Sequence, residues 1–124
     1  MKDRMAQEEH APRAVDPATL ERLLGLGDST LRRDLCTQLS ADIRRLREAV
    51  AGTEVGDVLR AAHELKGLAA TIGAIRLAEM ALALETAAAG SHPPHAAGLI
   101  PGLQAEADAV LTQLRDASAG GPSA

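Results

Sequence analysis

The residues best able to do chemistry lie close together, where His63 is followed three and four positions later by Lys66 and Gly67. A neutral imidazole is a competent nucleophile at pH 7, because its ordinary pKa is about 6.5. A phosphoryl group on the ring adds nearly two negative charges, and an ammonium one helical turn away neutralises part of them. Gly67 removes a side chain where a partner must approach, although it costs a helix about 1 kcal/mol relative to alanine. The three residue types therefore suit phosphoryl transfer.

One helix is predicted to position these residues, over residues 54–72, with Thr53 as its N-cap and Gly73 at its end. Its apolar residues recur at steps of three and four and form one stripe. The members of that stripe are Val55, Val58, Ala62, Leu65, Ala69 and Ile72. His63 lies off the stripe, and the lysine and glycine that follow it share its face. The helix is therefore expected to bury one side and to present the imidazole on the other.

The same stretch resembles a known family. The string A-H-E-L-K-G at residues 62–67, followed by I-G-A at 72–74, is similar to the signature of the histidine-containing phosphotransfer (HPt) family. The resemblance extends to the helix layout from about Val15 to Asp116. It implies a stand-alone phosphorelay intermediate in which His63 carries a phosphoryl group between receiver-domain aspartates. The partners implied are the receiver domains of a hybrid histidine kinase and of a response regulator.

A second site residue follows from the resemblance. In HPt domains a Glu or Gln on the helix after the histidine helix often accepts a hydrogen bond from the ring nitrogen that is not phosphorylated. Glu85 lies 22 residues beyond His63, where the family pattern places that residue. An acceptor on Nδ1–H would fix the tautomer and leave Nε2 as the nucleophile. The alternative is that Glu85 is an ordinary surface carboxylate.

The resemblance also implies a small, mostly apolar docking surface around His63. On the histidine helix it comprises Leu59, Gly67 and Ala70, with Arg60 and Lys66 at its edge. In the family, a short N-terminal helix packs across the end of the bundle near the active histidine. The exposed members of Leu20, Leu23 and Leu24 are therefore further candidates for docking. The alternative is that these leucines only cap the core.

No cofactor is expected on the chain itself, because in the family the receiver domain supplies the Mg²⁺ and the acidic pocket. The sequence has no Gly-rich nucleotide loop, so we expect neither ATP binding nor self-phosphorylation, and a phosphoryl carrier rather than a true enzyme. His92 and His95 lie in a proline-rich turn without the further ligands that a metal needs. A zinc-protease H-E-x-x-H motif is excluded because position 67 is glycine. No metal site is expected.

Composition narrows the class of protein. The 124 residues suffice for one domain with a single core, and they include no Phe, Tyr or Trp, which favours close-packed helices over a β-rich fold. The net charge of −4, with acidic and basic residues interspersed, gives no sign of nucleic-acid or anionic-membrane binding. The single Cys36 fits a reducing compartment and is expected to be a packing residue. No apolar run reaches transmembrane length and the polar start is no signal peptide, so we expect a cytoplasmic protein. Because no second long apolar face is present, we expect a monomer.

Periodicity predicts the remaining helices and the fold class. A short helix starts with Asp16 as N-cap, and long helices cover about residues 29–50 and 74–89. A last helix either begins near Pro101 or, as we favour, begins near His95 and is kinked at Pro101. The fold class is therefore all-α: an antiparallel up-down four-helix bundle with a short extra N-terminal helix. Residues 1–15 are expected to be a disordered tail, residues 16–117 the bundle domain, and residues 118–124 a frayed end.

Two alternatives stay open, the second of them a variant within the family that the sequence resembles. The first is a non-catalytic helical adaptor that binds receiver or kinase domains without being phosphorylated. The second is the phosphorylatable domain of a chemotaxis-type kinase, in which kinase modules would follow the bundle. The outer faces of the second helix also carry a basic cluster, which either orients an acidic partner or is simply solvated: Arg32, Arg33, Arg44, Arg45 and Arg47.

Overall fold

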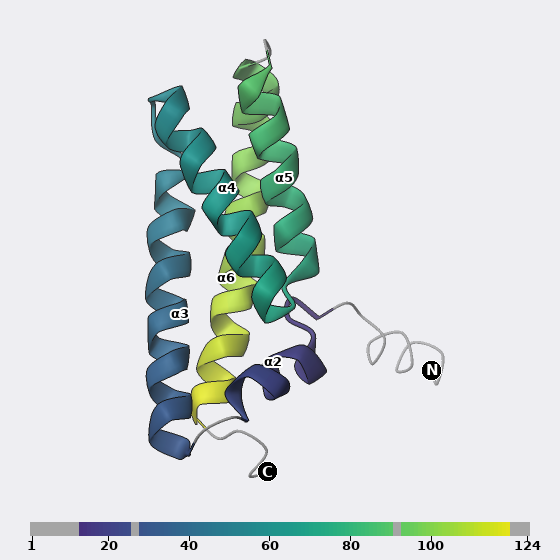
Figure 1. The fold of residues 1–124 in the computed structure, drawn as a ribbon. Helices are drawn as coiled ribbons and strands as arrows, with labels where there is room; N and C mark the ends of the chain where they lie inside the picture. Colours follow the sequence, from purple (N-terminus) through teal and green to yellow (C-terminus); the bar gives the residue numbers. More distant parts are fainter. Residues whose placement is uncertain (1–12, 26–27, 91–92, 120–124) are drawn as a thin grey trace, which may run out of the picture.

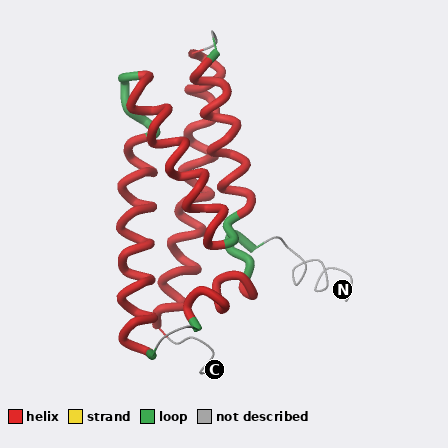
Figure 2. Tube along the Cα trace, in the orientation of Figure 1, coloured by secondary structure: helices red, strands yellow, loops and turns green. Residues whose placement is uncertain are grey.

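Four long helices form a bundle in which each runs antiparallel to the next along the chain, and a short helix lies across one end of them (Figure 1). The computed structural model describes residues 13–25, 28–90 and 93–119. The helices are α2 (Pro17–Leu24), α3 (Ser29–Ala49), α4 (Val55–Ile72), α5 (Ile75–Ala89) and α6 (Pro93–Ala119). Figure 2 shows a short loop between α3 and α4 and another between α4 and α5, and no strand occurs in the described ranges. The predicted fold class, an antiparallel four-helix bundle with a short N-terminal helix, is confirmed.

The core is entirely aliphatic apart from one cysteine. Each long helix packs against two others: α3 and α5 both contact α4, and both contact α6. The most extensive contact joins α4 to α5. No polar or charged side chain is buried in the part of the chain that the structure describes. The predicted stripe of α4 is buried from Val58 onward, whereas Val55 at its start is exposed. Burial of this stripe fixes the rotation of α4 and thereby the direction in which His63 projects.

Helix caps explain where most helices start. Asp16 caps α2 by accepting a hydrogen bond from the Thr19 backbone N–H, and Pro17 occupies the first turn. Asp28 caps α3 in the same way. The predicted cap of α4 is wrong by one residue. Its N-cap is Glu54, whose extended backbone makes Val55 the first helical residue, and no side chain caps it.

The start of the last helix also differs from the prediction. The helix α6 begins at Pro93, two residues before the predicted start near His95, because a proline fits the first turn of a helix, where its missing N–H needs no partner. It continues past Pro101 to Ala119. The structural expectations for residues 1–12, His92 and residues 120–124 lie outside the described residues. None of the helices that the structure describes is long and apolar enough to cross a membrane.

The segment before α2 is part of the core, which corrects the predicted tail at its last residue. Val15 is fully buried, its N–H donates to Gln113 Oε1 at 2.8 Å, and its carbonyl accepts from Gln113 Nε2 at 3.0 Å. The next N–H, that of Asp16, donates to the Gly73 carbonyl at 2.9 Å. The sequence pattern missed this segment because a single apolar residue has no periodicity. These bonds hold α2 at the end of α4 that lies at Ile72.

Candidate functional site

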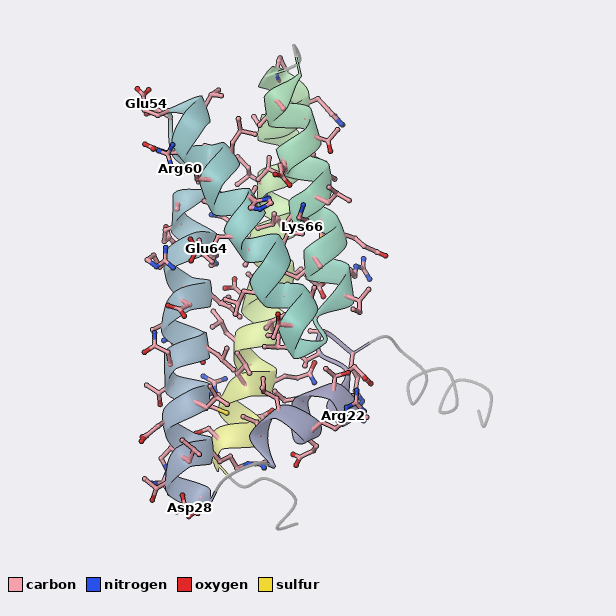
Figure 3. The ribbon with its side chains drawn as sticks, in the orientation of Figure 1. Arg22, Asp28, Glu54, Arg60, Glu64 and Lys66 are labelled. Atoms are coloured by element: carbon pink, nitrogen blue, oxygen red, sulfur yellow. The ribbon has the colours of Figure 1, made fainter. Side chains whose placement is uncertain are left out.

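The imidazole of His63 projects from the middle of α4, with 69% of its side chain exposed. Its neighbours Ala62 and Leu65 are fully buried, so the packing of α4 turns the ring outward. Figure 3 shows Lys66 on the side of α4 that faces α5, with Arg60 and Glu64 on the side that faces α3. The ring therefore lies on an open face between two flanks that both carry charge.

Glu85 of α5 joins the two cation-capable groups on that face. Its Oε2 lies 3.0 Å from His63 Nδ1, and its Oε1 accepts a hydrogen bond from Lys66 Nζ at 3.0 Å. His63 and Lys66 are one turn apart on α4, and α5 runs antiparallel beside it, which brings one carboxylate within reach of both (Figure 1). The structure thus brings together three of the residues that the sequence singled out.

The hydrogen bonds of this cluster select one tautomer of a neutral His63 ring. The hydrogen bond from Lys66 is the main cause that lowers the pKa of Glu85, and the bond to His63 adds to it, while partial desolvation opposes both. An ionised carboxylate can only accept hydrogen bonds, so a neutral ring must carry its proton on Nδ1. Nε2, on the opposite edge of the ring, has no hydrogen-bond partner among the described residues. This geometry leaves the Nε2 lone pair available.

Gly67 leaves an open space beside His63. A Cβ atom built at this glycine would meet no atom within 4 Å outside its own helix, so packing does not require a glycine here. Ala70, one turn further along α4, is also exposed, and Leu59 on the other side of His63 is half-buried. The surface on this part of α4 is therefore low and mostly apolar.

The remaining charges near the ring are paired with one another. Arg60 bonds to Asp57 one turn before it, and Arg45 of α3 bonds to Glu64 at 2.6 Å. Neither arginine bonds to Glu85 or His63. The structure therefore does not bring Arg60 into the cluster around Glu85, and its place at the edge of a docking surface stays a prediction.

The short helix α2 does not contribute the leucines that the sequence suggested. Leu20 and Leu24 are 4% and 2% exposed and belong to the core, so their assignment to an exposed docking surface is wrong. Leu23 is half-buried. The amphipathic pattern of α2 identified its apolar residues correctly, but an eight-residue helix that caps a bundle turns its most apolar face inward. Moreover, α2 packs where α4 ends, about 13 Å along the helix axis from His63 at 1.5 Å per residue.

One of the exposed large apolar side chains of the described residues lies on the same face of α5 as Glu85. Leu82 of α5 is 49% exposed and lies three residues before Glu85, so the two share a face of the helix. Glu85 bonds to both His63 and Lys66, and α5 is antiparallel to α4, so Leu82 is expected level with the turn of α4 that follows Lys66. Its spacing of three residues from Glu85 was the signal in the sequence that could have found it.

Other chemistry-bearing residues do not join the site. Within residues 13–25, 28–90 and 93–119 no group of three His, Cys, Asp or Glu side chains could hold a metal ion. His95 is exposed on α6. Cys36 is buried between helices, and this burial raises the pKa of its thiol, which makes the thiolate scarce.

The comparisons with known proteins agree with this geometry. The family model described as Hpt domain matches residues 30–117. No curated protein and no solved structure matches the chain significantly. The matched residues include His63, Lys66, Gly67 and Glu85 and extend over most of the chain. The chain therefore belongs to the Hpt domain family, whose function is histidine phosphotransfer in two-component signalling through interaction with receiver domains.

Proposed function

We propose that His63 carries a phosphoryl group between receiver-domain aspartates, from a hybrid histidine kinase to a response regulator. The observation that carries the proposal is the exposed ring whose Nδ1 lies 3.0 Å from Glu85 Oε2, while Nε2 is left without a partner among the described residues. A hydrogen bond at one nitrogen selects the other as the nucleophile, as in other sites where a carboxylate orients an imidazole. The two directions of transfer use the same geometry.

The proposed step conserves atoms and charge. The Nε2 lone pair attacks the phosphorus of a receiver phospho-aspartate, an N–P bond forms, and the P–O bond to the aspartyl carboxylate breaks. Positive charge develops on the ring during the attack, and the Glu85 carboxylate on Nδ1–H stabilises it. The receiver domain would supply the Mg²⁺ and its acidic pocket, so this chain contributes positioning and a nucleophile.

A docking surface for the receiver domain follows from the exposed apolar residues around His63. We assign to it Leu59, Gly67, Ala70 and Leu82, with Arg60 and Lys66 at its edge. The half-buried Leu23 remains a candidate for its periphery, whereas Leu20 and Leu24 are excluded by burial. The proposal places the relay in the cytoplasm and treats the domain as a monomer, which the molar mass measured in solution by light scattering tests.

The decisive experiment is phosphoryl transfer from phosphorylated receiver domains to the wild type and to His63→Gln. We expect label that is labile in acid and stable in base on the wild type and none on the variant, with the same helical circular dichroism for both. Label on a folded His63→Gln would assign the carrier to another residue. If a folded wild type takes no label from several receivers but still binds them, the protein is an adaptor and the proposal is wrong.

A further inference from the structure

We propose that the groove between α3 and α6 binds a small soluble molecule that carries phosphate groups. One wall of the groove comes from residues 36–44 of α3, and the other from residues 114–119 of α6. Its volume is about 380 Å³, which lies in the range of small-molecule sites. The proposed phosphoryl transfer does not use this groove, so the inference goes beyond that function and does not rest on it.

The groove lies on the side of the bundle away from His63. The helices α3 and α5 each contact both α4 and α6, so the edge between α3 and α6 is opposite the edge between α4 and α5. Figure 1 shows the end of α6 (yellow) beside the first half of α3 (blue). Arg32 Nε donates to the Ala117 carbonyl at 3.1 Å. Arg47 Nε donates to Asp108 Oδ1 at 2.8 Å. Along α3 the groove lies between these two contacts, which hold its walls together.

The charge of the groove distinguishes it from other hollows of the described surface. The charged residues of its described lining are Arg44 and Arg115, and both are exposed. Neither guanidinium forms an ion pair with another described residue. Two other hollows also hold two arginines each, but each holds two carboxylates as well: Asp16 and Glu79 in one, Glu21 and Asp116 in the other. In a chain of net charge −4, this groove therefore presents positive charge that no carboxylate of its described lining balances.

Hydroxyl groups add neutral donors to the two guanidinium groups. Three of them line the groove: Thr37, Ser40 and Ser118. The described side-chain hydroxyl groups that bond to protein atoms are those of Thr19, Thr71 and Thr112. The three in the groove thus have no protein partner within the described residues. Phosphate oxygens point in several directions, whereas carboxylate oxygens lie in one plane, so donors from two helices suit a phosphate better.

A soluble ligand fits the groove better than the headgroup of a membrane lipid. A helix that lies on a membrane places large apolar side chains next to its basic ones. The exposed large apolar residues of the described chain are Leu31, Val55, Ile75 and Leu82. None of these four lines the groove. The groove therefore offers the charge that attracts a phosphate without the apolar surface that would insert into a bilayer.

The test is a titration with inorganic pyrophosphate at low ionic strength, followed by the backbone amide signals in NMR spectra. We expect saturable shifts in residues 36–44 and 114–119, with a dissociation constant of about 1 mM or below. Arg44→Gln and Arg115→Gln should each raise that constant about tenfold, as expected for loss of a hydrogen bond to a charged group. The absence of saturable shifts in these two ranges would overturn the proposal.

Matched controls separate the groove from the general charge of the protein. Arg76→Gln removes another exposed arginine, which lies in a hollow that also holds two carboxylates. It should leave pyrophosphate binding unchanged, and so should His63→Gln. Equal weakening by Arg76→Gln and Arg115→Gln would mean that only overall charge matters. Loss of binding in His63→Gln would move the site to the opposite side of the bundle. Either result would overturn the proposal.

Two further probes test the chemical class of the ligand. Citrate carries a similar negative charge on carboxylates and should bind about tenfold more weakly than pyrophosphate. Equal affinity for citrate would reject the preference for phosphate. Vesicles of phosphatidylglycerol should not sediment the protein. Sedimentation with these vesicles that both Arg44→Gln and Arg115→Gln abolish would assign the groove to a lipid headgroup and overturn the proposal of a soluble ligand.

Discussion

Gly67 lies within α4, and Gly73, six residues later, ends this helix. The two positions are glycine for opposite reasons. Gly73 has φ +86°, and a Cβ atom there would lie 2.8 Å from Thr19 Cβ and 3.3 Å from Asp16 Cβ. At Gly67 the backbone is helical and a Cβ atom would meet nothing within 4 Å outside its helix. The fold requires the first glycine and only tolerates the second, which reduces helix stability.

Comparing the two glycines shows which of them the fold explains and which needs a functional reason. At Gly73 the turn between α4 and α5, the approach of α2 and the bond from the Asp16 N–H all explain the residue. At Gly67 no contact in the described structure explains it, and the residue lies one turn after the exposed ring of His63. Because Gly67 weakens its helix without helping it to pack and lies beside His63, we propose that it keeps this surface low for the receiver domain.

The strongest way to break this comparison is a long side chain at Gly67. We expect Gly67→Gln to slow transfer from a receiver domain about a hundredfold, because displacing the reacting groups by about 1 Å is enough for such a loss. Gly98→Gln is the matched control, since Gly98 lies in α6, also with nothing within 4 Å of its built Cβ. Initial rates of label transfer measure both. Normal transfer by a folded Gly67→Gln would show that the space is not used.

The opposite substitution tests the structural glycine. Gly73→Ala should lower the free energy of unfolding by about 2 kcal/mol, because alanine is strained at positive φ and its Cβ collides with Thr19. Urea unfolding followed by circular dichroism measures the change. The folded variant should still accept label on His63. A stability equal to that of the wild type would mean that α2 moves away without loss and that the turn is not constrained as described.

A smaller effect separates stability from function at Gly67. Gly67→Ala should raise the free energy of unfolding by about 1 kcal/mol, since alanine favours the helix and its Cβ has free space. Gly98→Ala should give a similar gain in the same urea experiment. A destabilised Gly67→Ala would contradict the open space around this residue and weaken the argument that its cost to the helix has a functional cause.

The smallest expected effect is on the pH dependence of stability. One carboxylate in each region has a lowered pKa: Glu85, chiefly through the bond from Lys66, and Asp16, chiefly through the Thr19 hydroxyl. A lowered pKa in the folded protein stabilises it fully above the ordinary values of 4.5 and 3.8, and this contribution is lost as the pH falls through the folded-state values. Unfolding free energies measured from pH 6 to pH 2.5 should fall less steeply for Glu85→Gln and for Asp16→Asn. Slopes identical to that of the wild type would contradict the two hydrogen-bond networks.

Much of the fold could be predicted because the sequence signals of a helix lie within a few residues of one another. Such local signals predicted the apolar stripe of α4, the N-cap at Asp16 and the glycine at the end of α4. The start of α6 was harder, since two prolines in sequence suggest a turn and equally suit a first helical turn. The burial of Val15 depends on Gln113, which is 98 residues away, and no local pattern contains that information.

The site was predictable as a set of residues and less so as a set of contacts. Spacing placed Lys66 on the face of His63, and family resemblance suggested Glu85. That Lys66 bonds to Glu85 depends on how α4 and α5 align, because the two residues are 19 positions apart on different helices. The same alignment decides that Leu82 is exposed beside the site while other leucines of α5 are buried. Periodicity ranks the faces of a helix but does not say which neighbour covers them.

The two hydrogen bonds between Val15 and the Gln113 side chain have a consequence for the order of folding. A contact across 98 residues is entropically unfavourable in an open chain, with a loop-closure cost of about 4 kcal/mol before other terms. Once α3 to α6 have packed, most of that separation is already closed, so the segment before α2 can attach at little further cost. The amide of Gln113 therefore acts late, as the step that completes a bundle already formed, and its release should be an early event when the protein opens.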